Sequence, residues 1–306
     1  MNCEQANQIP IVQILDTLGH QPKRKASNYY KYLSPFRPER TASFTVYLAT
    51  NHWHDFGTEE GGRAVDVVIK HLQQQGEAHT IPDALRWIGN MQGDKPLIRS
   101  VPVECHTPKD SNLILKATYN VKHPALIQYM QHRGIPEILT QSYLKELRLY
   151  NKESKKSFFA LGFQNEAKGY DFRNKFLKGC IGPKDISFIR GTKEHQDKIH
   201  LFEGGTDFLS RLRIKGVKRL EDDSIVLHSL AMLKKAAPFI QNYTYKTVFT
   251  WLDNDKSGER ATANVSDFCK TQNDLMHKPM SHQYRDHKDL NDFLVAKLSL
   301  KNRGIQ

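Results

Sequence analysis

Two apolar runs in this chain each stop at a carboxylate and continue into a turn that contains glycine. The first run, residues 199–202, is followed directly by Glu203. The second run, residues 247–252, is followed by Asp253, with Asp255 two positions later. Buried parallel strands look like this when the turns that follow them carry charged side chains at the carboxyl edge of the sheet. The pattern predicts an open, mostly parallel sheet with acidic residues gathered at one edge.

The spacing of these acids points to a metal site. Asp253 and Asp255 alternate across an extended backbone, so both side chains face the same way and can share one hard cation. Glu203 and Asp207, from the other strand and its turn, could complete the cluster. Such carboxylates repel one another unless a divalent ion is present, which predicts a Mg²⁺ (or Mn²⁺) site suited to phosphates. The alternatives are an aspartate that caps a helix, or a first-turn helix charge at Asp207.

Composition sets the broad class. With 306 residues the chain is long enough for two or three small domains, and 45 Lys and Arg against 33 Asp and Glu give a net charge of +12. This balance favours a polyanion-binding surface around an acidic pocket. We find no signal peptide and no apolar run of about 20 residues, so we expect a cytoplasmic protein that does not bind membranes. The four cysteines are widely spaced, which indicates neither a disulfide scaffold nor a thiolate zinc site.

Changes in pattern divide the chain. The predicted segments are a small domain at 1–95, a linker at 96–111, a basic second unit at 112–197 and a strand–helix domain at 198–306. In the last segment we expect strands at 199–202, 224–227 and 247–252, separated by helices near 207–214, 230–241 and 259–271, with a final strand near 279–284. This alternation predicts helices on both faces of the sheet.

The acidic elements resemble a known domain. Glu203-Gly204 followed by Asp207, and then Asp253-x-Asp255-x-x-Gly258, are similar to the Toprim domain shared by bacterial primases, topoisomerases and some nucleases. Residues 288–294, which include Asp289 and Asp292, look like the third acidic motif of primase-type Toprim domains. The order and separation of the three elements make this resemblance specific.

The resemblance extends upstream. Residues 158–185 look like the basic subdomain that precedes Toprim in primase cores, and residues 32–44 with 53–66 are similar to the primase zinc ribbon. The implied fold class is α/β (α+β overall): a Rossmann-like parallel Toprim sheet, preceded by a basic primase-core subdomain and a small zinc-ribbon-like domain.

The ribbon departs from its family. Where the family carries Cys, His, Cys and Cys, this chain has Ser34, Arg37, Asp55 and Thr58, which do not form a set of soft zinc ligands. We therefore expect no zinc, with the ribbon shape held by packing of aromatic residues. The residues of this domain that we expect to meet phosphates are Arg37, Arg40 and Arg63.

The resemblance implies a function and roles for residues. It implies a Mg²⁺-dependent, primase-like nucleotidyltransferase that makes RNA primers from NTPs on single-stranded DNA. Glu203, Asp253 and Asp255 would bind metal, with Asp289 and Asp292 as further ligands; Glu203 could instead be the general base, and Asp207 would join the catalytic set. Residues expected to meet template or nucleotide phosphates are Arg173, Lys175, Lys178, Lys184, Lys256 and Arg260. For the basic segment near 168–184, a solvated hairpin is the alternative.

Two other functions stay open. A Toprim nuclease would use the same metal to activate water, and a non-catalytic DNA-binding remnant of a primase would explain the lost zinc ligands. The resemblance leaves no residues for a C-terminal helicase-binding domain. We therefore expect an accessory protein of a mobile element, plasmid or phage, which works with a separate helicase or with mobilisation proteins.

Overall fold

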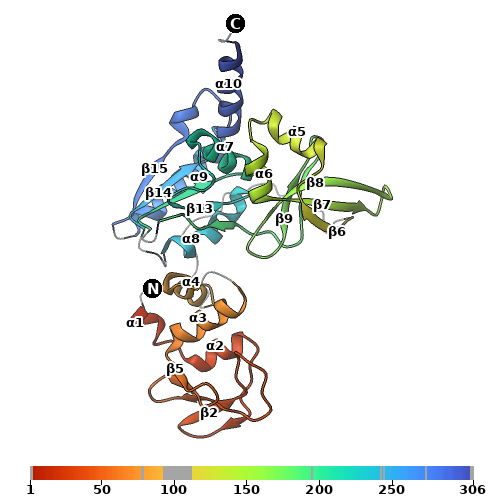
Figure 1. The fold of residues 1–306 in the computed structure, drawn as a ribbon. Helices are drawn as coiled ribbons and strands as arrows, with labels where there is room; N and C mark the ends of the chain where they lie inside the picture. Colours follow the sequence, from red (N-terminus) through yellow and green to blue (C-terminus); the bar gives the residue numbers. More distant parts are fainter. Residues whose placement is uncertain are drawn as a thin grey trace. The chain divides into compact units, whose positions relative to one another are not determined.

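The computed structural model describes residues 3–76, 79–91, 112–193, 196–241, 243, 245–272 and 274–303. The chain divides into two compact units, one of residues 1–96 with 238–243 and one of residues 97–237 with 244–306 (Figure 1). The linker predicted at 96–111 lies outside the described residues. In the described ranges, no helix combines the length and the apolar character needed to cross a bilayer.

The first unit is an antiparallel sheet with short helices. Its strands follow the order of the sequence: β1 (Arg24–Lys25), β2 (Tyr29–Tyr32), β3 (Phe44–Tyr47), β4 (His52–Asp55) and β5 (Glu60–Gly62). Its helices are α1 (Cys3–Ala6), α2 (Ile11–Thr17), α3 (Ala64–Gln74) and α4 (Ile81–Met91). Val65, Val68 and Leu72 recur at helical spacing on α3 and are buried. Trp53 stacks on Phe44 with ring centroids 4.9 Å apart, so aromatic packing fills the centre of this sheet.

The second unit begins with a five-stranded antiparallel sheet. Its strands are β6 (Leu113–Asn120), β7 (Leu144–Asn151), β8 (Lys156–Gln164), β9 (Tyr170–Arg173) and β10 (Lys178–Ile181), again in sequence order. Helices α5 (Pro124–His132) and α6 (Glu137–Tyr143) lie between β6 and β7 in the chain. The basic segment near 168–184 is thus the β9–β10 hairpin, whose four residue pairs run from Tyr170 with Ile181 to Arg173 with Lys178.

The third sheet is the predicted parallel one. Its order is β11 (Ser187–Ile189), β13 (Asp223–Val226), β12 (Lys198–Phe202), β14 (Thr247–Trp251) and β15 (Met276–Pro279), and only the edge strand β11 is antiparallel. The associated helices are α7 (Gly205–Lys215), α8 (Leu233–Gln241), α9 (Lys256–Lys270) and α10 (Leu290–Arg303), with 3₁₀ turns η1 (Leu230–Met232) and η2 (Ser281–Tyr284). Helices α7 and α10 pack together (Figure 1). The predicted mixed α/β fold class is confirmed.

One predicted strand is wrong. The final strand covers Met276–Pro279, whereas residues 281–284 form η2. Tyr284, at the end of the predicted strand, is buried without strand pairing. Its ring stacks on Trp251, and its hydroxyl donates to the carbonyl of Leu252 at 2.8 Å.

Aromatic residues form the core beneath the carboxyl edge of this sheet. Phe202 and Trp251 are register partners at the ends of β12 and β14, and their rings stack 5.9 Å apart. Phe208 of α7 meets Phe202 edge-on at 5.5 Å. The pairing fixes Glu203 and Asp253, which follow these strand ends, at neighbouring points of the edge.

Candidate active site at the carboxyl edge of the parallel sheet

Glu203 and Asp253 meet where β12 and β14 end. The backbone N–H of Asp253 donates to Oε2 of Glu203 at 3.1 Å, so the glutamate side chain leans across to the neighbouring strand. Burial, together with the charge of Asp255, raises the pKa of Glu203, while Lys178 and Lys288 act to lower it. Glu203 is therefore a partly desolvated acid that has both acidic and basic side chains near it.

Asp253 is surrounded by other acidic side chains. Burial, followed by the charges of Glu203 and Asp289, raises the pKa of Asp253 to about 7. Within the described part of the chain, the only cation paired with this carboxylate is Lys288, whose Nζ lies 4.0 Å from Oδ2 of Asp253. A carboxylate that holds its proton near neutral pH without a counter-ion gains most from a bound cation.

Asp207 and Asp289 belong to the same electrostatic group. Asp207 lies in the first turn of α7 and is only 5% exposed. Its Oδ1 accepts from the N–H of Asn291 at 3.3 Å, which ties α7 to the start of α10. Burial, then the charges of Asp289 and Asp253, raises the pKa of Asp207 well above its usual range. The third acidic motif is therefore near the first two.

Asp255 has two roles. Its Oδ1 accepts from the N–H groups of Ser257 and Gly258, each at 2.9 Å, which makes it the N-cap of α9. A Cβ on Gly258 would lie 2.0 Å from the carbonyl oxygen of Asp253, so the turn requires glycine. Asp255 also acts electrostatically on both Glu203 and Asp253. The helix-capping alternative and membership in the cluster thus coexist.

The donor set fits a hard divalent cation, as a Toprim-like domain implies for Mg²⁺. Oxygen ligands are what Mg²⁺ prefers, and few are needed because the ion keeps water and substrate phosphates as its other ligands. As they stand, no three His, Cys, Asp or Glu side chains in the described ranges are arranged to hold a metal. The fit therefore rests on chemistry and charge: Glu203, Asp253 and Asp289 gather close enough to shift pKa values. Asp292 is exposed and donates its N–H to Oδ1 of Asp289 at 2.7 Å, and its role as a ligand stays a prediction.

Asn254, between the two aspartates, is a residue that sequence reasoning missed. Its side-chain amide donates to the carbonyls of Tyr284 at 2.9 Å and His287 at 3.0 Å. Its backbone N–H donates to the carbonyl of Lys288 at 2.7 Å. These hydrogen bonds hold the loop that leads to Asp289 against the end of β14. An amide between two acids at a buried strand end was the available signal.

Asn291 is a second missed residue. It is 1% exposed, and its amide donates to the carbonyl of Arg133 and to Oγ of Ser210, each at 2.9 Å. Arg133 returns a hydrogen bond from Nη1 to Oδ1 of Asn291 at 2.8 Å. These contacts join the loop after α5 to α7 and α10, and they fix the position of the third acidic motif. A buried asparagine within an acidic motif gave the only hint.

The predicted cationic residues take different positions. Arg173, at the end of β9, donates from Nη1 to Oγ1 of Thr206 at 2.8 Å, which places it beside the turn after Glu203. Lys178 of β10 acts electrostatically on Glu203. Lys175 lies over the ring of Phe176 at 5.9 Å, at the tip of the hairpin. Lys184 lines a cavity next to the hairpin, and Lys256 and Arg260 are exposed at the start of α9.

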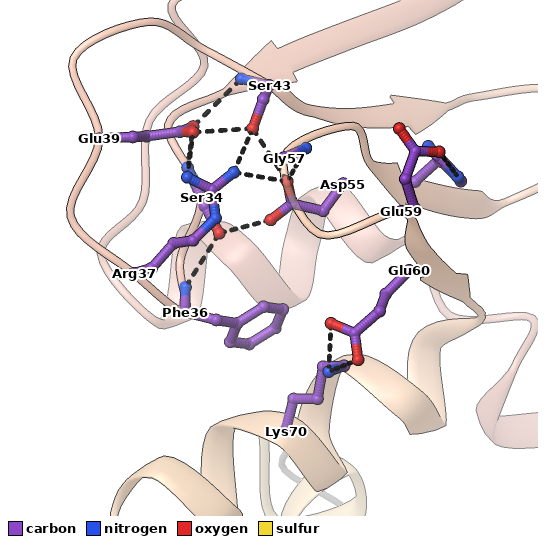
Figure 2. A network of polar contacts seen from close by, with 11 residues as sticks. Ser34, Phe36, Arg37, Glu39, Ser43, Asp55, Gly57, Glu59, Glu60 and Lys70 are labelled. Atoms are coloured by element: carbon purple, nitrogen blue, oxygen red, sulfur yellow. Dashed lines mark hydrogen bonds and ion pairs between the residues drawn. The ribbon is translucent and has the colours of Figure 1, made fainter.

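Three of the four positions of the expected zinc ligands, Ser34, Arg37 and Asp55, form a polar network instead (Figure 2). Asp55, at the end of β4, is 1% exposed and accepts from Oγ of Ser34 at 2.7 Å and from Nη2 of Arg37 at 2.8 Å. The N–H of Gly57 also donates to it at 2.9 Å, and Oγ of Ser43 lies 2.9 Å from it. Burial alone would raise the pKa of Asp55, but the hydrogen bonds from Ser34, Arg37, Gly57 and Ser43 lower it to about 2.

Glu39 closes the network on the opposite side (Figure 2). Its Oε2 pairs with Nη1 of Arg37 at 2.7 Å and lies 2.7 Å from Oγ of Ser43, whose single proton serves either Glu39 or Asp55. Thr58, the fourth expected ligand position, is exposed. The Asp55 carboxylate accepts hydrogen bonds from Ser34, Arg37 and Gly57, and no thiolate or imidazole lies among these groups, so this donor set does not fit zinc. Of the other predicted cations here, Arg40 and Arg63 are exposed.

Comparison with known families agrees with this layout. Residues 200–294 match the Toprim-like family, and residues 3–86 match the CHC2 zinc finger family. Residues 114–182 match a family described as a domain of unknown function. The chain thus combines a zinc-finger-type domain with a Toprim-like domain, and the Toprim assignment made from the acidic motifs is confirmed.

Two curated relatives match parts of the chain. The chain is 23% identical over 335 residues to a "DNA primase" of Chlamydia pneumoniae, covering 85% of this chain and 52% of that protein. It is 30% identical over 103 residues to a "DNA primase" of Chlamydia trachomatis, covering 34% of this chain and 16% of the relative. The chain spans about half the length of the first of these relatives.

Two solved structures are also similar. The zinc-binding and RNA polymerase domains of the Aquifex aeolicus primase give a TM-score of 0.42 at 15% identity, covering 98% of this chain and 83% of that one. The primase fragment of the bacteriophage T7 primase-helicase protein gives 0.40 at 15% identity, covering 87% and 93%.

Proposed function

We propose that this protein is a Mg²⁺-dependent primase that synthesises RNA primers from NTPs on single-stranded DNA. The observation that carries the proposal is the acidic cluster at the carboxyl edge of the parallel sheet, where burial and neighbouring acids raise the pKa of Asp253 to about 7. The "DNA primase" relatives, aligned over 85% of the chain in the first case, support synthesis as the use of this site.

The residues of the acidic cluster and of the β9–β10 hairpin would have different roles in primer synthesis. Asp253, Asp255 and Asp289 would hold the ion, which when bound neutralises phosphate charge and activates the attacking oxygen. Glu203, whose pKa is raised mainly by burial, would accept the proton of the attacking 3′-hydroxyl. Arg173 and Lys178, on the β9–β10 hairpin, would bind nucleotide or template phosphates beside the cluster. Asp207 is enclosed and hydrogen-bonded to Asn291, which suits it to position the third motif.

We also propose that the zinc-finger-type domain takes no zinc. The Asp55–Arg37 network supports this, because it ties together the same two loops that a metal would bridge. Elemental analysis of protein purified from zinc-supplemented cells should find no stoichiometric zinc. The matched control is a variant with the family's ligands restored, S34C with R37H, D55C and T58C. Stoichiometric zinc in the wild-type protein would contradict the proposal.

Primer synthesis tests the enzymatic proposal. Labelled NTPs, a circular single-stranded DNA template and Mg²⁺ should yield short RNA products that EDTA abolishes. A cleavage assay on the same template without NTPs is the counterpart, since the nuclease alternative uses the same acids. Metal-dependent nicking without primer synthesis would replace our proposal with the nuclease. The absence of both, with DNA binding retained, would favour the non-catalytic remnant.

The biological setting follows from the proposal. Single-stranded DNA is the expected partner, together with a separate helicase or mobilisation proteins, and a plasmid, phage or other mobile element is the expected context. A pull-down from a host that carries the neighbouring genes, with DNase treatment to remove bridging DNA, should recover such a helicase. Recovery of replication proteins of the host chromosome alone would contradict the mobile-element context.

A further inference from the structure

A cavity of about 770 Å³ lies beside the β9–β10 hairpin, within the second unit. Its apolar lining includes Phe158, Phe172 and Met232, and its polar lining includes Asp171 and His228. A largely apolar cavity of several hundred cubic ångströms with a few converging polar groups is the usual form of a small-molecule site. The question is which chemistry its polar groups would recognise.

The hydrogen bonds around His228 assign its tautomer. Oγ of Ser187 donates its only proton to the carbonyl of Gln164 at 2.7 Å. The same Oγ lies 2.7 Å from Nε2 of His228, so Nε2 must carry the proton in that contact. Burial lowers the pKa of His228 to about 4, so the ring is neutral at physiological pH. Nδ1 is therefore a bare lone pair.

This lone pair has no hydrogen-bond partner among the residues that the structure describes. The His228 side chain is 7% exposed, and its Nδ1 is among the buried polar atoms that lack one. The residue also has a φ of +60°, a conformation that costs energy in a residue other than glycine. A buried, unpaired acceptor calls for an explanation, and a donor group of a bound ligand is one.

Asp171 of β9 faces the same point. Its Oδ2 lies 3.8 Å from Nδ1 of His228. Burial raises the pKa of Asp171 to about 6, against the charges of Lys178, Arg173 and Lys184, so it is ionised at pH 7.5. Two acceptors thus face each other with no proton between them. An N–H₂ group placed about 2.9 Å from each would satisfy both.

We propose that this cavity binds the base of a nucleotide that carries an exocyclic amino group, with that group between Asp171 and His228. Adenine, guanine and cytosine have such a group with two protons, whereas uracil carries carbonyl oxygens and a single ring N3–H, which can donate to only one of the two acceptors. The aromatic walls would contact the face of the base. The choice of a nucleotide, rather than another ring with an amino group, rests on the proposed function.

Charge links this cavity to the acidic cluster. Lys178 lines the cavity and acts electrostatically on Asp171, on His228 and on Glu203. Lys184 also lines the cavity. A nucleotide whose base occupies the cavity would find Lys178 and Lys184 as cations for its phosphates.

The test is nucleotide binding, measured without DNA so that no primer is made. Equilibrium dialysis of the full chain at pH 7.5 against ATP, GTP, CTP and UTP should show UTP binding about tenfold more weakly than the other three. D171N replaces one acceptor with a group that can donate to a carbonyl, so discrimination against UTP should fall to about twofold or less. H228F, which keeps a ring but removes Nδ1, should reduce it as well.

A matched control separates this site from general charge effects. Asp185 also lines the cavity, but its carboxylate is paired with Nζ of Lys235 at 2.9 Å. D185N should therefore keep the full discrimination against UTP. Thermal melting of each variant checks the fold. Equal binding of all four nucleotides by the wild type, or unchanged discrimination in D171N and H228F, would overturn the proposal.

The outcome is independent of primer synthesis. If the wild type makes no primers but discriminates against UTP through Asp171, the cavity proposal stands and the proposed function falls. If it makes primers but binds the four nucleotides equally, the proposed function stands and the cavity proposal falls.

Discussion

The protein has carboxylates at two places where its families place a metal, and the two behave in opposite ways. In the ribbon-like unit, Asp55 is 1% exposed, yet hydrogen bonds from Ser34 and Arg37 help to lower its pKa to about 2 against the effect of burial. At the Toprim-like edge, burial and then Glu203 raise the pKa of Asp253 to about 7. Asp55 accepts hydrogen bonds from the protein's own donors, whereas Asp253 is surrounded by other acidic side chains.

This difference supports the proposal that the first carboxylate replaces a metal and the second needs one. Arg37 brings a fixed positive charge and several donors to Asp55, as a metal would bring charge and coordination. Lys288, at 4.0 Å, gives Asp253 much less. We infer that the first site has become independent of metal, while the second keeps the electrostatic demand for a cation.

The largest expected effect is the loss of catalysis when the acidic cluster of the Toprim-like site is changed. In Asp253→Asn, one member of the acidic cluster loses its charge, and primer synthesis should fall by about 100-fold or more. The loss should show in kcat with saturating NTPs, and binding of single-stranded DNA should persist. Asp267→Asn is the control, because Asp267 is an exposed acid of α9 paired with Lys270 at 3.0 Å. Full activity in Asp253→Asn would remove Asp253 from the mechanism.

The next effect concerns stability in the ribbon-like unit. Asp55→Asn removes the charge that pairs with Arg37, so we expect a loss of about 3 kcal/mol in the opening free energy of this unit. Hydrogen exchange at the amides of β3 and β4 measures it in the intact chain. The control is Lys70→Ala, which breaks the exposed 2.8 Å pair with Glu60 and should cost less than about 0.5 kcal/mol. Equal losses in the two variants would mean that the network contributes no more than a surface pair.

Acid titration sharpens the same contrast. The folded pKa of Asp55 lies below its ordinary value of 3.8, so the stability that it contributes is present above about pH 4 and is lost as pH falls through about 2. The loss should amount to about 2 kcal/mol for this group. The indole N–H of Trp53, which donates to the carbonyl of Arg63 at 3.1 Å, gives an NMR signal that reports the folded unit. If this signal were lost already between pH 6 and 5, Asp55 would not control the transition.

Local patterns predicted much of this molecule. The alternation of apolar runs and helices predicted the parallel sheet, and the strand ends located Glu203 and Asp253, because a buried parallel strand must stop where charge begins. Substitution at the zinc positions predicted that zinc ligands are missing. It did not reveal that Arg37 and Asp55 pair with each other, since residues 18 apart in sequence show no contact until the sheet forms.

The misses have a common physical cause. Asn254 and Asn291 act through side-chain amides that reach segments far away in the sequence, and neither has a periodic signature. The cavity acceptors are Asp171 on β9 and His228 in the bend after β13, which belongs to a different sheet, so only tertiary structure brings them together. The strand expected near 279–284 failed because Tyr284 is buried by stacking rather than by strand pairing.

The smallest expected effect concerns Asn254. It tests whether the crowding of acidic side chains at the Toprim-like edge depends on the loop that Asn254 holds. Asn254→Ala removes the amide bonds to the carbonyls of Tyr284 and His287 but keeps the backbone bond to Lys288. We expect kcat to fall about tenfold, about 1.4 kcal/mol, because Asp289 is held less firmly. Raising Mg²⁺ should restore part of the rate in Asn254→Ala, whereas Asp253→Asn, which loses a charge, should not respond. An unchanged rate would show that the backbone bond alone positions the loop, and the crowding of Asp253 would then not depend on the asparagine amide.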